Sequence, residues 1–441
     1  MLMIRWAACV GLLLLGGCAV VPGEKRHSPA EIAAYQHADF VAPIASLDGE
    51  RLAREEALQT IRTAVALPPG LEAEGLVPRA LWNIGFLNVE KPAGLALVLA
   101  ALPDLADKDA TYQRGILSAA YTLYPSETAP LVVPLLTRIT TPREFAIAAY
   151  TLLQADDSAV RRDFIRATMH TQFPNWRQEP RLQRLDYVLT TDLRQAIAAR
   201  PPLVDLLAHP IRAGRPVVFS FQRQDRRRFG LAVVRGADGR FVRNKDGSVF
   251  HIAHLANAIT NLPGTITNGN TPQGLFTIVG AGTATNKWIG PTPYLESKVP
   301  VEASLAEYEH LEKTENSWTE AAYEAFLPET WRGYTLFKEA YLAGQAGRDE
   351  MLMHGTTINS DYYRGASYFP GTPSAGCLVA METWDAREGR MQTSDHLALI
   401  KAFTRDGHDR GYLVVVELDD RLTPVALADV LADVLVAEAG K

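Results

Sequence analysis

Two short segments contain the residue types that cysteine-based acyl transfer requires. His354 closes an apolar run and precedes Gly355, and Cys377 ends a Ser-Ala-Gly-Cys turn that begins at Ser374. Such catalysis needs a thiolate, an imidazole that takes up and returns a proton, and hydrogen-bond donors for the developing oxyanion. The small residues before the cysteine let the N–H groups of Gly376 and Cys377 turn toward a tetrahedral oxygen. The pattern therefore indicates acyl transfer at this turn.

The N-terminus indicates the compartment. Arg5 precedes an apolar stretch at 7–15 that has the length of a signal-peptide core and is too short to span a bilayer. The Leu-Gly-Gly-Cys sequence that ends at Cys18 resembles the bacterial lipobox, in which the cysteine thiol is acylated before cleavage. We therefore expect a signal peptide at 1–17 and lipidation of Cys18. An ordinary signal peptide with an incidental cysteine is the alternative.

The residue after the lipobox and the cysteine content refine this expectation. Ala19 in place of Asp implies, through the same resemblance, a periplasmic protein anchored by lipid to the outer membrane. Of the three cysteines, Cys9 leaves with the signal peptide and Cys18 carries lipid. Cys377 then has no second cysteine with which to form a disulfide, in a compartment where disulfides form readily. It is either a small buried core residue or a reactive one.

The first half of the chain is expected to be helical. Residues 18–48 have the composition of a tether with at most one short helix. Ala and Leu dominate residues 49–208 and β-branched alternation is rare, which predicts an all-helical domain. The pentapeptide Ala-Ala-Tyr-Thr-Leu occurs at 119–123 and again at 148–152. This repeat predicts an array that resembles HEAT repeats, and an irregular helical bundle is the alternative. We expect either a structural role or an envelope protein partner for this domain.

From residue 209 the pattern changes to that of a sheet. Turn residues separate runs that are rich in Val and Phe. We expect a mainly β domain at 209–420, a helical insertion within it at 282–349, and a C-terminal helical segment at 421–441. The insertion is acidic and aromatic, and it either packs on the domain or covers a substrate groove. The expected strands lie at 216–221, 229–234, 275–279 and 412–418.

The charge content argues against several classes of partner. The chain has 44 basic and 50 acidic residues, a net charge of −6, which gives no support to nucleic-acid binding. Four arginines at 223 and 226–228 mark either a solvated hairpin tip or a patch for an anionic polymer. The other histidines show no metal-ligand spacing, so we expect no metal site.

Two motifs together resemble those of the L,D-transpeptidases of the YkuD type. Residues 354–355 and 374–377 resemble the family signature of a His, a spacer and Ser/Thr-His-Gly-Cys. The segment at 270–278, Asn-Thr-Pro-Gln-Gly-Leu-Phe-Thr-Ile, resembles the family's Thr-Pro-x-Gly-x-Phe-x-Ile. The resemblance covers about 212–420 apart from the insertion. Together with the helical region it predicts an α+β chain with an N-terminal all-helical domain followed by a mainly β, YkuD-like catalytic domain.

The resemblance implies a role for each matching residue. Cys377 is expected to be the nucleophile and His354 the general base and acid, with the Gly355 carbonyl orienting the imidazole. The amides of Gly376 and Cys377 are expected to form the oxyanion hole, and Ser374 to support the turn. In this family the thiolate attacks the L-to-D peptide bond after a diamino acid in a peptidoglycan stem and releases D-alanine. An amine then resolves the thioester, and neither a metal nor an organic cofactor is implied.

The sequence departs from the family pattern at two positions. Ala375 stands where the family has His, and Val379 stands where it has Arg or Asn. A polar group that binds substrate is therefore missing at each position. The expected replacements lie in the loop between the two motifs: Asn359, Tyr362, Tyr363, Arg364 and Tyr368.

These observations predict a periplasmic cysteine acyltransferase that acts on peptidoglycan peptides. Alternatives that keep the same machinery are an L,D-carboxypeptidase or amide hydrolase and an acyltransferase on another envelope polymer. A non-catalytic envelope scaffold is a further alternative, although the presence of both His354 and Cys377 argues against it.

Overall fold

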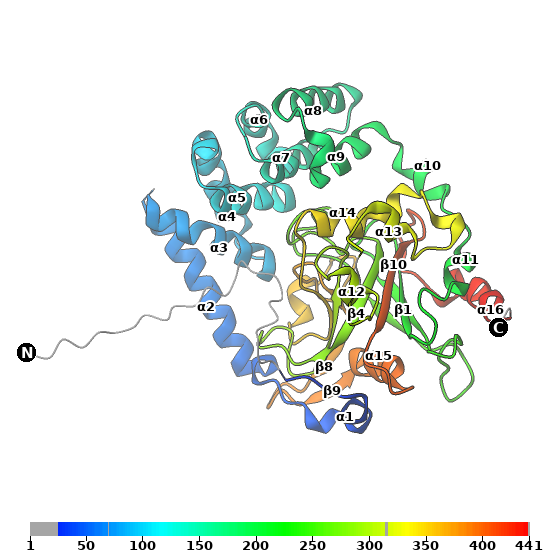
Figure 1. Ribbon diagram of the computed structural model, residues 1–441. Coiled ribbons are helices and arrows are strands. Elements are labelled where there is room, and N and C mark those ends of the chain that lie inside the picture. Colours follow the sequence, from blue (N-terminus) through cyan, green and yellow to red (C-terminus); the bar gives the residue numbers. More distant parts are fainter. Residues whose placement is uncertain (1–24, 69, 314–315, 440–441) are drawn as a thin grey trace, which may run out of the picture.

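The computed structural model describes residues 25–68, 70–313 and 316–439, and it combines helices with one large sheet (Figure 1). The helices from α2 to α9 form an arc along one side of the sheet domain. The chain is thus of mixed α+β class, with a helical N-terminal part and a C-terminal sheet of eight strands. The expected signal peptide at 1–17 and the lipidation site Cys18 lie outside the described residues.

The N-terminal half contains helices of up to 20 residues. Several begin at a side chain that accepts backbone N–H bonds, as Asp109 does from Thr111 and Tyr112. The helices are α1 (Pro29–Ala34), α2 (Leu47–Ala66), α3 (Leu71–Leu87), α4 (Lys91–Ala101), α5 (Ala110–Leu123), α6 (Pro125–Leu136), α7 (Pro142–Ala155), α8 (Ala159–Gln172), α9 (Pro180–Thr190), α10 (Leu193–Ala198) and α11 (Leu203–Ala208).

Apolar faces at helical spacing assemble the helical core. Ile116, Leu117 and Ala120 of α5 are fully buried in it. The two copies of the pentapeptide lie in α5 and α7, which pack against each other. The prediction of a helical domain is confirmed, whereas the resemblance to HEAT repeats stays a prediction.

The C-terminal half contains the sheet and shorter helices. Its strands are β1 (Val217–Gln222), β2 (Gly230–Arg235), β3 (His251–His254), β4 (Gly274–Gly282), β5 (Tyr294–Lys298), β6 (Met351–His354), β7 (Leu378–Val379) and β10 (Gly411–Glu417), with β8 (Glu382–Trp384) and β9 (Met391–Ser394) as a separate pair. Its helices are α12 (Leu305–Tyr308), α13 (Glu320–Glu324), α14 (Glu339–Gln345), α15 (Asp395–Thr404) and α16 (Leu431–Ala439).

The large sheet is buried on both faces. Its order is β3-β2-β1-β10-β4-β5-β6-β7, and the β1–β10 and β6–β7 pairs are parallel. Along β10, Tyr412 and Val414 enter one core cluster while Leu413 and Val415 enter the other. Because side chains alternate across a strand, a continuous apolar run fills both layers. The four strands predicted from such runs are confirmed as β1, β2, β4 and β10.

The predicted insertion at 282–349 is partly wrong. It contains β5, which pairs with both β4 and β6 in the middle of the sheet. The sequence of β5, Tyr-Leu-Glu-Ser-Lys, lacks an apolar run, so its pattern does not indicate a strand. Three aromatic side chains of the rest of the insertion, Tyr308, Tyr323 and Trp331, are fully buried in the core on one face of the sheet. They pack on the domain, whereas residues 285–289 of the same insertion line a cavity together with His354.

The predicted tether at 18–48 is wrong over its described part, because residues 25–48 pack on the sheet domain. Ile32 of α1 is fully buried among sheet and α15 side chains. Arg26 pairs with the buried Glu296 of β5 and forms a β-bridge with Gly282. His27, Phe40 and Ala42 are buried as well. These few side chains follow no helical or strand period, so the sequence pattern does not reveal that the segment is docked.

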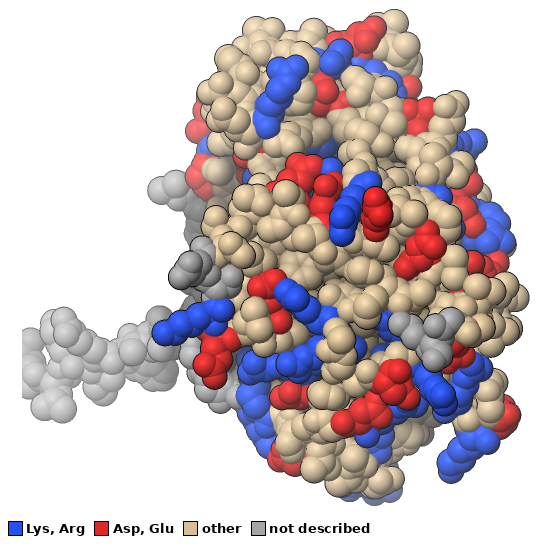
Figure 2. Space-filling model, turned by 45° about the vertical axis from the view of Figure 1, so that its right-hand side comes forward, with Lys and Arg blue, Asp and Glu red and all other residues tan. Residues whose placement is uncertain are grey.

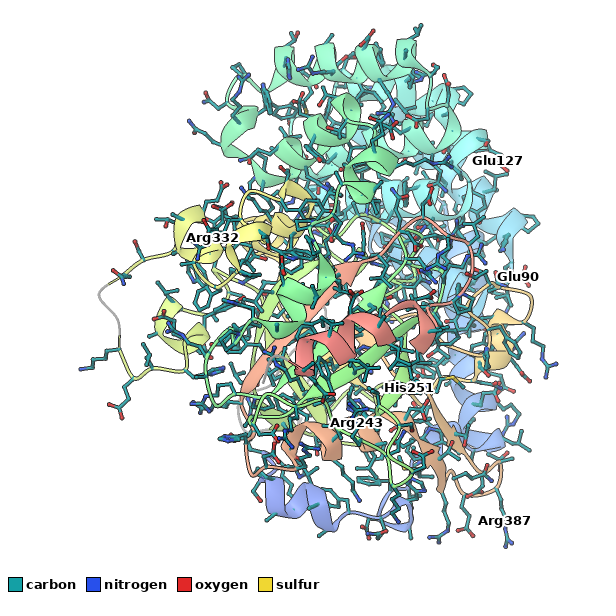
Figure 3. All side chains as sticks on the ribbon, turned by 90° about the vertical axis from the view of Figure 1, so that its right-hand side faces the viewer. Glu90, Glu127, Arg243, His251, Arg332 and Arg387 are labelled. Carbon is teal, nitrogen blue, oxygen red and sulfur yellow. The ribbon has the colours of Figure 1, made fainter. Side chains whose placement is uncertain are left out.

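The helical part is fixed on the sheet domain at several points. The Thr122 hydroxyl donates to the carbonyl of Thr260 at 2.8 Å, and Leu262 enters the helical core. At the other end of the array, α11 packs on α16 and joins the core of the sheet domain. In the side view of Figure 3, Glu127 of the helical part lies above the sheet domain, which carries His251 and Arg243.

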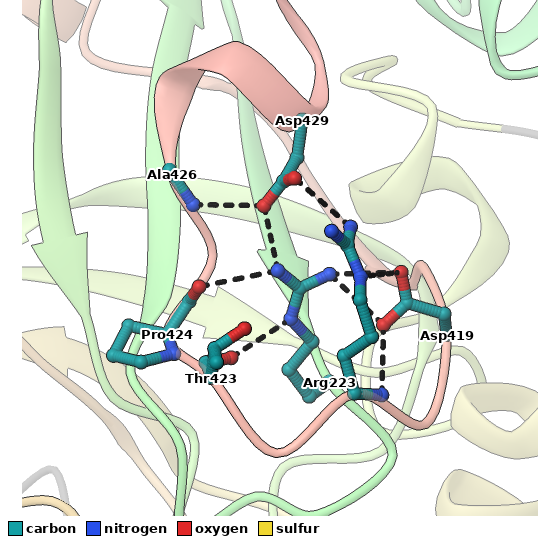
Figure 4. A network of polar contacts seen from close by, with 7 residues as sticks. Arg223, Asp419, Thr423, Pro424, Ala426 and Asp429 are labelled. Atoms are coloured by element: carbon teal, nitrogen blue, oxygen red, sulfur yellow. Dashed lines mark hydrogen bonds and ion pairs between the residues drawn. The ribbon is translucent and has the colours of Figure 1, made fainter.

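The arginine cluster at 223–228 is divided between the interior and the surface: Arg227 is exposed and pairs with Asp225 at 2.8 Å, whereas Arg223 and Arg226 are buried. Arg223 has no exposed surface and donates to Asp419 at 2.9 Å and to Asp429 at 2.6 Å (Figure 4). Arg226 is buried and pairs with Glu417 at 2.9 Å. On the face drawn in Figure 2, basic and acidic side chains are interspersed without a large field of one sign.

Removing both carboxylates from Arg223 should destabilise the sheet domain strongly. Asp419→Ala combined with Asp429→Ala leaves a buried guanidinium without its counter-charges, which costs about 3–5 kcal/mol. The matched control is Arg421→Ala, because Arg421 pairs with the same carboxylates but is half exposed, and we expect a change below about 1 kcal/mol. Urea unfolding of the three proteins measures the difference, and equal losses would contradict the interpretation.

Candidate active site

The pairing of β6 with β7 brings the two predicted catalytic segments together. The strands are parallel, with Met353 opposite Leu378 and His354 opposite Val379. Just before this register, the amide of Leu352 lies 3.4 Å from the sulfur of Cys377. The thiol in turn lies 3.7 Å from the carbonyl oxygen of Glu350. Cys377 therefore lies alongside the beginning of β6, and His354 is the last residue of the same strand.

His354 is held in one tautomer by the backbone. Its Nδ1 bonds to the carbonyl oxygen of Gly355, which can only accept, so Nδ1 carries the proton. Nε2 is buried and makes no hydrogen bond of normal geometry with the described residues. Burial lowers the pKa of His354, but interaction with the Cys377 thiolate and the Gly355 carbonyl outweighs it, and the pKa is raised. The basic nitrogen is therefore the one available to Cys377.

The turn that carries the cysteine is fixed by Ser374. The serine hydroxyl donates to the carbonyl of Cys377 at 2.7 Å and accepts from the amide of Gly376 at 3.0 Å. The Gly376 amide, expected in the oxyanion hole, is therefore already bonded in this conformation. Gly376 has a φ of +125°, and a Cβ there would lie 2.4 Å from Arg348. Only glycine combines this backbone conformation with such a close neighbour.

Arg348 is a buried cation near Cys377 that the sequence analysis missed. Its guanidinium lies 2.6 and 2.8 Å from the carbonyl oxygens of Gly264 and Ile266. Burial lowers the pKa of Arg348 to about 10, while the thiolate of Cys377 opposes that shift. A guanidinium is charged at neutral pH, so its field favours the thiolate form of the cysteine.

The second motif at 270–278 supports the same turn. The Thr271 hydroxyl donates to the carbonyl of Gly376 at 2.8 Å. Two segments about a hundred residues apart in sequence therefore meet at the cysteine.

Glu382 is a second missed residue, and it packs beneath His354. Its carboxylate accepts from the amide of Thr356 at 3.1 Å and from the Ser394 hydroxyl at 2.7 Å. A side chain at Gly355 would overlap it, since a Cβ there would lie 2.0 Å from its carboxyl carbon. Burial raises the pKa of Glu382 to about 7, against hydrogen bonds and the charge of His354 that lower it. This carboxyl fixes the backbone turn whose carbonyl orients the imidazole.

A cavity of about 520 Å³ reaches the site from the interface between the helical part and the sheet domain. His354, Ser374, Ala375 and Val379 line its sheet-domain side. Cys377 itself is 3% exposed and packs with Ile289, Tyr294 and Leu352. The sulfur therefore lies behind the residues that face the cavity.

The five loop residues expected to replace the missing substrate ligands lie elsewhere. None of them lines this cavity, and their contacts are with the helical part or within the loop itself. The Tyr363 hydroxyl donates to the carbonyl of Phe86 at 2.9 Å, and the carbonyl of Tyr362 accepts from Asn88 at 3.3 Å. The remaining three serve the loop itself: Asn359 caps the short helix at 360–363, Arg364 pairs with Asp361, and the Tyr368 ring packs on Tyr363.

Comparisons with known proteins add no identification. No family model matches the sequence, and neither the curated proteins nor the solved structures include a match to this chain. Within residues 25–68, 70–313 and 316–439, no group of three or more His, Cys, Asp or Glu side chains is placed to hold a metal ion. In the same part of the chain, no helix is both long and apolar enough to cross a membrane.

Glu382→Gln should remove one source of pH-dependent stability. Because the pKa of Glu382 is raised in the folded state, from 4.5 to about 7, its stabilising proton is lost as the pH rises through that range. Glutamine keeps the shape and can hold both hydrogen bonds but does not titrate. We expect the stability of the wild type relative to the variant to fall between pH 5 and pH 8, as measured by urea unfolding. Parallel stability curves would contradict the assigned pKa shift.

Proposed function

We propose that this protein is a cysteine acyltransferase that acts on peptidoglycan stem peptides, as the resemblance to L,D-transpeptidases of the YkuD type implies. The observation that carries the proposal is the arrangement of His354. The Gly355 carbonyl holds its Nδ1, and interaction with the Cys377 thiolate raises the pKa of the imidazole. A histidine oriented in this way suits proton transfer with a neighbouring nucleophile.

The reaction that we propose has two steps. The Cys377 thiolate adds to the carbonyl carbon of the donor peptide bond, and the C–N bond breaks as the His354 imidazolium gives its proton to the leaving amine. An acceptor amine then attacks the thioester, His354 takes up the proton of that amine, and the C–S bond breaks to restore the thiolate. If water takes the place of the amine, the same residues catalyse hydrolysis.

The compartment belongs to the same proposal. A periplasmic location with a lipid anchor on Cys18 rests on the sequence at 1–18 alone. The low exposure of Cys377, 3%, would limit its oxidation in such a compartment.

The burial of Cys377 also favours a second candidate, a non-catalytic envelope scaffold. A cysteine packed among Ile289, Tyr294 and Leu352 behaves as a small apolar core residue unless ligand binding moves the residues that cover the sulfur. The two candidates differ in whether the thiol reacts with an acyl donor.

Acylation by a carbapenem separates these candidates. We expect the wild-type protein to gain the mass of the carbapenem and Cys377→Ala to gain none. His354→Ala should retain the fold and lose at least about 100-fold in acylation rate, in line with the usual effect of losing a general base. Intact-protein mass spectrometry measures both. His251→Ala is the matched control, because His251 is an exposed histidine that does not line the cavity.

Two results would contradict the catalytic proposal. Unmodified wild-type protein with every acyl donor tried would favour the scaffold. Unchanged acylation of His354→Ala would remove the role assigned to that residue.

The composition of the cell wall identifies the reaction. Cells that carry Cys377→Ala in place of the wild type should lose direct cross-links between diamino acids, as measured by muropeptide profiling. A change in stem length alone would indicate a carboxypeptidase. An unchanged profile would contradict a peptidoglycan substrate and favour another envelope polymer.

A further inference from the structure

One wall of the catalytic cavity comes from the helical domain. Glu56 of α2 and Arg79, Trp82 and Phe86 of α3 line it, and His354 and Ala375 lie on the sheet-domain side. The sequence of the helical domain carries no catalytic pattern, yet its second and third helices enclose the space next to the proposed catalytic pair.

This wall is fixed in place. The Phe86 carbonyl accepts from the Tyr363 hydroxyl at 2.9 Å, and the Phe86 ring lies 4.9 Å from the Trp288 ring and 6.2 Å from the Tyr362 ring. Asn88, at the end of α3, bonds to the same loop. Aromatic pairs and backbone-directed hydrogen bonds hold α3 against the domain that carries the nucleophile. The cavity is therefore a built feature of the domain interface.

Apart from His354, which exchanges its proton with Cys377 in the proposed reaction, the charges that line the cavity sum to +1. The charged lining residues are Glu56, Arg79 and Lys287, and Glu56 lies 3.9 Å from Lys287 as its ion-pair partner. Arg79 is half-buried, and within the part of the chain that the structure describes it makes no hydrogen bond or ion pair. This excess contrasts with the net charge of −6 of the whole chain. A guanidinium without a counter-charge in a cavity is a binding site for an anion.

The rest of the lining is mostly apolar and aromatic. Trp82, Phe86 and Trp288 form one side, and Ile259 and Ile358 add aliphatic surface. A small number of polar groups in an apolar cavity is typical of a site that binds an organic ligand and orients it. A free phosphate ion would make no contact with this apolar surface. A peptide that carries a carboxylate would contact both the apolar surface and the guanidinium of Arg79.

We propose that the cavity binds a peptide that carries a carboxylate, with Arg79 pairing with the carboxylate and Trp82 packing on its apolar part. This inference rests on the proposed function, because it names the substrate chemistry of the same site. It also assigns the helical domain a share of the substrate site in place of a purely structural role.

Binding can be measured apart from chemistry in the Cys377→Ala background. The probes are the tetrapeptide L-Ala-γ-D-Glu-L-Lys-D-Ala with its carboxylates free and the same peptide with every carboxylate amidated. We expect the acid to bind at least about tenfold more tightly than the amide by isothermal titration calorimetry, which corresponds to about 1.4 kcal/mol. Arg79→Gln should abolish this preference, and Arg79→Lys should retain part of it.

Two further variants control the experiment. Arg62→Gln removes an exposed arginine of α2 that bonds to Gln59 and does not line the cavity, and it should bind both peptides as the parent does. Trp82→Ala should weaken binding of acid and amide alike, since it removes packing surface and no charge. Thermal unfolding of each variant confirms that it is folded.

The outcomes separate this inference from the proposed function. Equal binding of acid and amide by the parent, or an unchanged preference in Arg79→Gln, would overturn the inference even where a carbapenem acylates the wild type. Loss of acid binding when inorganic phosphate is added at an equal concentration would overturn the choice of a peptide carboxylate. A preference that depends on Arg79 in a protein that no donor acylates would support the binding site and contradict the catalytic function.

Discussion

The short parallel contact between β6 and β7 is the constraint on which the candidate site depends. It spans two residue pairs, yet it sets His354 beside a cysteine that lies 23 positions later in the chain. So short a strand needs support on its other side. Val379 exchanges two backbone hydrogen bonds of 2.9 Å with Leu255, and Thr271 holds the carbonyl of Gly376. The site is thus positioned by backbone pairing at the end of the sheet, and that register sets the places of His354 and Cys377.

Three buried ionisable groups, Arg348, His354 and Glu382, have opposing effects on the ionisation of the Cys377 thiol. Arg348 and His354 both favour a negative sulfur, whereas Glu382, whose pKa is raised to about 7 by burial, would oppose it when ionised. Glu382 packs against Gly355, and its charge interacts with the His354 imidazole. The nearer cations therefore dominate at the thiol. This arrangement also explains why the sequence requires glycine at 355 and 376, because a Cβ at either position would collide with Glu382 or Arg348.

The parts of this structure that sequence patterns could predict are those with local signals. Long apolar runs marked β1, β2, β4 and β10, and the residue types of His354 and Cys377 marked the candidate site. β5 escaped prediction because a buried glutamate and serine occupy its centre. The packing of residues 25–48 escaped because their few buried side chains, among them Ile32 and Phe40, follow no periodic pattern. Arg348 and Glu382 carry no pattern at all, since their roles depend on neighbours that are distant in the chain.

The contribution of the helical domain to the cavity also depends on residues that are distant in the chain. It bears on Ala375 and Val379, the two departures from the motif that resembles that of the transpeptidases. Ala375 and Val379 both line the cavity, so each missing polar side chain leaves apolar surface on the sheet-domain side. The opposite wall supplies a guanidinium and an indole from α3. A binding group that is absent from one wall of a shared cavity can be replaced from the other, provided that the two walls are held in register. The contacts of Phe86 and Asn88 with the loop at 358–368 provide that register, which ties the loop residues to the positioning of the helical wall.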